Sequence, residues 1–138
     1  MKRTIVGAAM VGLAVGCGGG LSVSGQPQPL PEPAAEPRWE MIDEDHVRIW
    51  PTSAAVEEGV AYRMTAFTHC GLDHLFDLDG SFWEVAEGPA ESGEALDNPE
   101  DEGVVTLVAS DTAVYASSTG AEFRLRRLDG PREVLLCE

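Results

Sequence analysis

Two histidines and a cysteine lie close together in the middle of the chain, at His69, Cys70 and His74. Imidazole nitrogen and thiolate sulfur are the usual ligands of zinc and copper, so this cluster is a candidate metal site. On a single strand, however, His69 and His74 would project from opposite faces, unless Gly71 bends the chain. The spacing therefore favours an ordinary pair of surface histidines, and metal binding by His69 and His74 is kept as an alternative.

Carboxylates are dense between residues 84 and 102, and calcium takes six to eight oxygen ligands. The stretch from Asp97 to Gly103 lacks the alternating aspartates of an EF-hand loop. We therefore expect a solvated acidic loop rather than a calcium site. The carboxylates of this segment are Glu84, Glu87, Glu91, Glu94, Asp97, Glu100, Asp101 and Glu102.

Motifs of catalysis are missing from the sequence. It contains no Gly-x-Ser-x-Gly nucleophile motif and no glycine-rich phosphate loop, so no catalytic residue is assigned and no cofactor is expected. Trp39, Trp50 and Trp83 could line a sugar or peptide site, although one or two of them are expected in the core. The chain is interpreted as a binding or interaction module of unknown ligand, with a small cell-envelope enzyme as the competing class.

The amino-terminal segment has the layout of a secretory signal peptide. Lys2 and Arg3 precede an uncharged apolar run over residues 4–15, and Ala14-Val15-Gly16 ends it with small residues. A transmembrane helix is the alternative, but a span needs about 20 apolar residues and this run is shorter.

The residue after this segment is Cys17, and Ala14-Val15-Gly16-Cys17 resembles the lipobox of bacterial lipoproteins. Leu13 lies four places before the cysteine, whereas lipoboxes usually carry leucine three places before it. The resemblance implies cleavage after residue 16, acylation of Cys17, and attachment to the extracytoplasmic face of the cell membrane through lipid. Two acyl chains suffice for stable anchoring.

Cys70 and Cys137 are then the remaining cysteines. In an exported small domain such a pair predicts a disulfide, and a bridged thiol cannot serve as a metal ligand. The whole chain has a net charge of −15, and removing residues 1–16 takes away Lys2 and Arg3, so no lysine remains. This balance repels phosphate backbones, so nucleic acid is excluded as an expected partner.

The composition divides the chain into three parts. Residues 1–16 form the signal peptide, and residues 17–37 form a tether rich in glycine and serine near Cys17 and in proline from Gln26 to Pro37. Such a tether is expected to be extended. Residues 38–138 are expected to form one domain of about 100 residues, near the commonest domain size.

Short alternating runs separated by turns predict an all-β domain, a small antiparallel sandwich or barrel with at most one short helix, at residues 52–58. Asp79-Gly80 between apolar runs predicts a hairpin with a type I′ turn. Phe123 and Leu125 are expected to face inward, and Arg124 and Arg126 outward. The expected strands cover residues 47–50, 60–68, 72–78, 81–85, 104–109, 113–117, 121–127 and 134–136.

The motif Thr68-His69-Cys70-Gly71, followed by Gly80-Ser81-Phe82-Trp83, resembles small exported proteins of high-GC Gram-positive bacteria. In those proteins a Thr-His-Cys-Gly segment precedes an aromatic hairpin with a glycine turn. The resemblance covers about residues 60 to 137 and implies no catalytic residues.

Overall fold

The computed structural model describes residues 25–52, 55–69, 76–89 and 95–136. In these residues the prediction of an all-β protein is confirmed, because every regular element is a strand and none is a helix. The short helix expected at residues 52–58 is absent from Ala55 to Glu58, where Glu58 instead forms an isolated bridge to Leu107. Cys17, Cys70, His74 and Cys137 lie outside the described residues.

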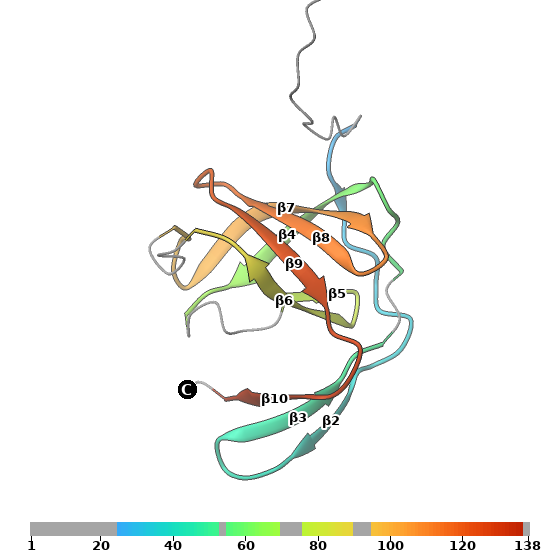
Figure 1. Cartoon of the computed structure of the whole chain (residues 1–138), viewed down its shortest axis with the longest axis vertical. Coiled ribbons are helices and arrows are strands. Elements are labelled where there is room, and N and C mark those ends of the chain that lie inside the picture. Colours follow the sequence, from blue (N-terminus) through green and yellow to red (C-terminus); the bar gives the residue numbers. More distant parts are fainter. Residues whose placement is uncertain (1–24, 53–54, 70–75, 90–94, 137–138) are drawn as a thin grey trace, which may run out of the picture.

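Most strands belong to one curled sheet, which forms half of a barrel in the upper part of Figure 1. Its order is β1-β4-β7-β8-β9-β6-β5. Neighbours are antiparallel except β1 and β4, which run parallel, so the sheet is mixed. The parallel strand lies before residue 38, and all strand pairs from β2 to β10 are antiparallel, as predicted for residues 38–138. The bounds are β1 Gln28–Pro29, β4 Ala61–Phe67, β5 Phe76–Leu78, β6 Ser81–Glu87, β7 Glu100–Ala109, β8 Thr112–Ser117 and β9 Glu122–Arg127.

The predicted hairpin at Asp79-Gly80 is confirmed. Leu78 pairs with Ser81, and φ is 62° at Asp79 and 90° at Gly80, the positive values that a type I′ turn requires. A Cβ atom at Gly80 would lie 2.8 Å from the hydroxyl of Thr52 and 3.3 Å from Pro33, so a side chain is excluded here by contact as well as by φ.

The concave face of the curled sheet holds the hydrophobic core. Phe123 and Leu125 on β9 are fully buried while Arg124 and Arg126 point outward, as the alternation predicted. Trp83, Tyr115 and Phe123 are the largest fully buried side chains. They come from neighbouring strands, β6, β8 and β9, so the core is built largely within this one sheet.

Three further strands form a separate small sheet in the order β10-β3-β2, at the bottom of Figure 1. All its pairs are antiparallel. The expected strands at residues 47–50 and 134–136 belong to this second sheet rather than to a single barrel. The bounds are β2 Arg38–Met41, β3 His46–Trp50 and β10 Arg132–Leu135.

The polyproline segment also contributes to the fold. Gln28 and Pro29 pair with Tyr62 and Arg63 of β4, and Leu30 packs against the hydrophobic core. Pro29 is tolerated in β1 because β1 is an edge strand of the sheet. The division of the chain at residue 38 stays a prediction, but residues before it take part in the sheet.

The acidic segment differs from the expected solvated loop, because both of its ends are strands. Glu84 and Glu87 belong to β6, and β7 begins at Glu100. Asp101 is fully buried. Its carboxylate accepts hydrogen bonds from Tyr115 Oη at 2.5 Å, Ser117 Oγ at 2.8 Å and the Asp97 backbone N–H at 3.0 Å. Burial is the larger cause that raises the pKa of Tyr115, and the hydrogen bond from its hydroxyl to the Asp101 carboxylate is the next.

Candidate ligand-binding groove

An apolar groove lies between the small sheet and the curled sheet. Its volume is about 560 Å³, within the range of small-molecule and peptide sites. One wall is formed by β2 and β3, and Phe82 on β6 lies across from it. The lining residues are Glu36, Pro37, Trp39, Met41, Val47, Ile49, Phe82 and Leu136.

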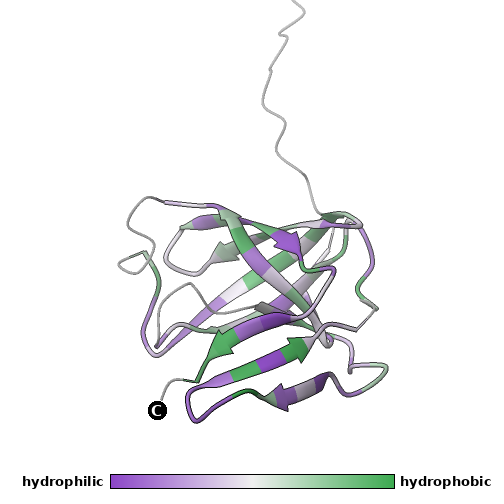
Figure 2. Cartoon of the chain, turned by 60° about the horizontal axis from the view of Figure 1, so that its bottom comes forward, coloured by the Kyte–Doolittle hydropathy of each residue, from purple (hydrophilic) through white to green (hydrophobic). Residues whose placement is uncertain are grey.

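The apolar wall follows directly from strand alternation. In the register of β2 and β3, Trp39 is opposite Ile49 and Met41 is opposite Val47, so these four side chains share one face of the small sheet. Figure 2 shows the alternation of hydrophobic and hydrophilic residues along these strands. Nothing in the described chain covers this face fully, because Trp39 is 64% exposed and Met41 is 54% exposed.

The opposite face of the small sheet carries most of its charged side chains, beside Trp50 and Leu135. Arg38 lies over the ring of Trp50, with its guanidinium carbon 4.1 Å from the ring centroid. Arg48 forms an ion pair with Glu133 on β10 at 2.6 Å. Along β2 and β3 the apolar side chains therefore share one face of the small sheet and the charged side chains share the other.

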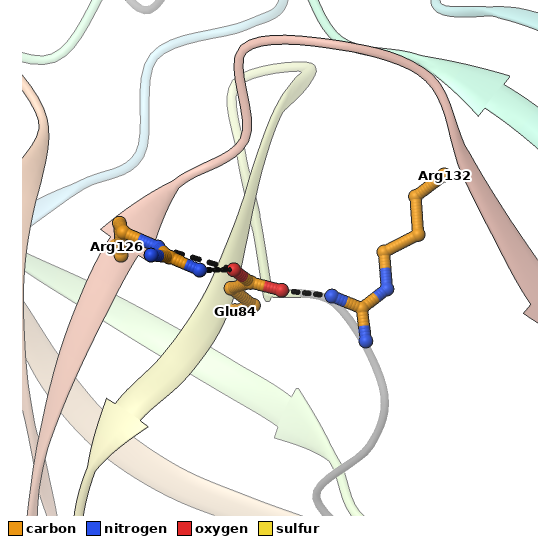
Figure 3. Close-up of polar contacts among 3 residues, drawn as sticks. All are labelled: Glu84, Arg126 and Arg132. Atoms are coloured by element: carbon orange, nitrogen blue, oxygen red, sulfur yellow. Dashed lines mark hydrogen bonds and ion pairs between the residues drawn. The ribbon is translucent and has the colours of Figure 1, made fainter.

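An ion-pair cluster connects the small sheet to the curled sheet beside the groove. Glu84 on β6 accepts hydrogen bonds from Arg126 on β9 and from Arg132 on β10, and Figure 3 shows its carboxylate between the two guanidinium groups. The side chain of Glu84 is only 19% exposed. Phe82 lies two residues earlier on the same strand, so the cluster fixes the spacing between the two walls of the groove.

The hairpin that joins β2 to β3 is held by one side chain at its tip. Asp43 Oδ1 accepts hydrogen bonds from the backbone N–H groups of Asp45 and His46 and from His46 Nδ1 at 2.8 Å. The hydrogen bond from His46 lowers the pKa of Asp43, and the same bond raises the pKa of His46. This turn fixes the register that places Trp39 opposite Ile49.

The structure separates the three candidate tryptophans. Trp39 lines the groove. Trp50 lies on the opposite face of the small sheet, under Arg38. Trp83 is fully buried in the core, where its indole N–H donates to Ser81 Oγ at 2.8 Å. Only Trp39 is placed to contact a ligand in this groove.

Of the candidate metal ligands, His69 lies in the described part of the chain, and Cys70 and His74 lie outside it. His69 is exposed, and its ring centroid is 6.1 Å from that of Phe67. Within the described ranges no group of three or more histidine, cysteine, aspartate or glutamate residues is arranged to hold a metal ion.

Sequence reasoning missed most of the groove. The alternation of Trp39 and Met41 is the available signal, but it is short and follows directly on the proline-rich segment, so the sequence predicts no strand here. Phe82 comes from a distant hairpin, and nothing in its local pattern indicates a partner on β2 or β3.

A second cavity of about 370 Å³ lies beside the link from β9 to β10 and is lined by Pro51, Thr52, Arg127, Leu128 and Asp129. It is polar, and Arg127 Nη2 donates to the Thr52 carbonyl at 3.1 Å within it. Its Thr52 hydroxyl and Arg127 Nε are buried without a hydrogen-bond partner in the described residues. Such groups are typically satisfied by ordered water.

No protein-family model, no curated protein and no solved structure matches this chain. In the described ranges there is also no helix of a length and apolarity that would cross a membrane.

Proposed function

We propose that this chain is a lipid-anchored binding module of the extracytoplasmic face, and that its ligand binds in the groove between the two sheets. The observation that carries the proposal is the exposure of Trp39 and Met41 on a wall of ordered strands. A solvent-exposed tryptophan and methionine in a groove are costly for solubility, and such patches are typical of binding sites.

The anchoring part of the proposal rests on the resemblance of Ala14-Val15-Gly16-Cys17 to a lipobox. Lipid on Cys17 and the tether that follows it would hold the folded part close to the membrane surface while leaving it in the aqueous phase. A disulfide between Cys70 and Cys137 belongs to the same proposal, because export places the pair in an oxidising compartment.

The anchor is tested by metabolic labelling with a radioactive fatty acid. Wild-type chain should carry the label and fractionate with membranes, and Cys17→Ser should lose both. Cys70→Ser is the matched control, because it removes a cysteine without touching the lipobox. Membrane retention of an unlabelled wild-type chain would overturn lipid anchoring.

The groove is tested with Nile red, a neutral apolar dye that fluoresces when it leaves water. We expect saturable binding to the full chain, weakened about tenfold or more by Trp39→Ser, a loss of about 1.4 kcal/mol. Phe67→Ser is the matched control: Phe67 is 56% exposed but lies on β4, outside the groove. Equal losses in the two variants, or no saturable binding, would contradict a ligand site at the groove.

A further inference from the structure

We infer that the ligand of the groove is an extended peptide segment with alternating apolar and basic residues, which adds a strand to the free edge of β2. This inference rests on the groove being a ligand site, as proposed above. It adds the class of the ligand and the way in which the ligand is held.

The free edge of the small sheet is also a wall of the groove. In the order β10-β3-β2, β2 has a strand neighbour on one side only within the described residues. Its four residues, Arg38–Met41, are ordered by pairing with β3 along their full length. An ordered edge strand beside a groove is the surface that binds peptides by strand addition.

The alternation of hydrogen-bonded and non-hydrogen-bonded pairs between β2 and β3 shows which backbone groups of β2 point toward its free edge. Ile42 N donates to His46 O at 2.9 Å, so this pair is a hydrogen-bonded pair of the antiparallel ladder. Such pairs alternate along the ladder, which makes Glu40 and Arg38 the next residues bonded to β3. The backbone N–H and C=O groups of Trp39 and Met41 therefore point toward the free edge.

The same two residues supply the exposed apolar side chains of the groove wall. A strand added beside β2 would place every second side chain on the groove face, next to Trp39 and Met41. Those side chains would be apolar. An acyl chain could fill the groove as well, but it would leave the polar groups of the edge unused.

The charges on the face of β2 that points away from the groove indicate which side chains the ligand carries on that face. Glu40 lies in the middle of β2, opposite Arg48, but Arg48 forms its ion pair with Glu133. Within the described residues Glu40 has no ion-pair partner, and Arg38, its neighbour on this face of β2, lies over the ring of Trp50. A lysine or arginine of the added strand that lies opposite Glu40 would complement its carboxylate, and the acidic balance of the chain favours basic residues at the other positions on this face.

A second copy of this chain fits the edge less well. The chain carries 24 acidic residues against 9 basic ones, so two copies approach against a like-charge field. A basic segment is attracted by the same field. The observations therefore favour a different, basic partner over self-association.

The test uses the full chain and synthetic blocked peptides of about eight residues, a length typical of one strand. The first peptide alternates valine and lysine, the second valine and glutamate, and the third is the valine–lysine peptide with alternate backbone nitrogens methylated. We expect the first peptide to bind at least about tenfold tighter than either control. Its affinity should fall with added salt.

Two variant pairs locate the site on the protein. Met41→Pro removes an N–H that faces the free edge and should abolish peptide binding, while Met41→Ala truncates the same side chain and keeps that N–H. Proline is compatible with an edge position of this kind, so the fold is retained. Glu40→Gln should weaken binding several-fold, whereas Glu122→Gln, the same charge change on β9, should not.

Each outcome has one meaning. Equal binding of the methylated peptide, or of Met41→Pro and Met41→Ala, would overturn strand addition. Equal binding of the glutamate peptide would overturn the basic ligand, and dimers seen by sedimentation that dissociate on Met41→Pro would replace the peptide by a second copy. If Nile red binds at Trp39 and no peptide does, this inference fails and the groove remains a ligand site; if neither binds, both proposals fail.

Discussion

Both sheets of this protein alternate apolar and polar residues along their strands, but they differ in whether the apolar face is buried. On the curled sheet the apolar face is closed, and Trp83, Tyr115 and Phe123 are fully buried. On the small sheet the apolar face is open, and Trp39 and Met41 remain largely exposed. A seven-stranded sheet can curl over its own apolar face, whereas a three-stranded sheet cannot, so its apolar face needs another surface. The buried apolar side chains are thus concentrated in the curled sheet, and most of the large exposed ones in or beside the small sheet.

The sharpest test of this division compares two tryptophans. Trp83→Ala removes a fully buried side chain and should lower the free energy of unfolding by about 3–5 kcal/mol. Trp39→Ala removes a side chain that is 64% exposed and should change it by less than about 0.5 kcal/mol. Urea denaturation followed by circular dichroism measures both, and similar losses would contradict the division.

The buried carboxylate of Asp101 should come next in size. Asp101→Ala removes the carboxylate that accepts hydrogen bonds from the Tyr115 and Ser117 hydroxyl groups and from the Asp97 N–H, at a cost of about 2–3 kcal/mol. The control is Glu100→Ala, which removes an exposed neighbour on the same strand. A loss no larger than that of the control would show that this network does not stabilise the curled sheet.

A smaller effect is expected where the two sheets are joined. Glu84→Gln weakens the bonds to Arg126 and Arg132, and because both arginines can regain water the cost should be about 1 kcal/mol. It should also weaken Nile red binding, since the spacing of the groove walls depends on this contact. The matched change is Glu87→Gln, which affects the exposed ion pair between Glu87 and Arg124, 3.6 Å apart. It should alter neither the free energy of unfolding nor Nile red binding.

The smallest effect is local to the tip of the β2–β3 hairpin. The pKa of His46 is raised by its hydrogen bond to Asp43, so the contact favours the folded state below pH about 6.5 and is lost as pH rises through the raised pKa. Titration by NMR should show a His46 pKa above the ordinary value. Asp43→Asn should bring it back, and an unchanged pKa in that variant would remove Asp43 as the cause.

Local chemistry explains the parts of the fold that could be predicted. Asp79-Gly80 specifies its turn because few residues adopt positive φ in succession, and Phe123 and Leu125 face inward because strand alternation leaves no other choice. The sequence predicts a loop before Val104, because glycine and acidic residues disfavour strands. Gly103 is nevertheless in β7, paired with Met64 and Ser117. A Cβ there would lie 2.5 Å from the ring of Tyr115, so the approach of β8 requires a glycine, and no local pattern contains this contact between two strands.

The sequence by itself determined the all-β class, the turn at Asp79-Gly80, the inward residues of β9 and the acidic character of the chain. These features depend on the conformational preferences and charges of neighbouring residues. Only the tertiary structure decided that the strands divide between two sheets, that Asp101 is buried, and that Trp39 faces a groove while Trp83 lies in the core. Strand pairing joins residues far apart in the sequence, such as Val47 and Val134, and the choice among pairings depends on the whole chain.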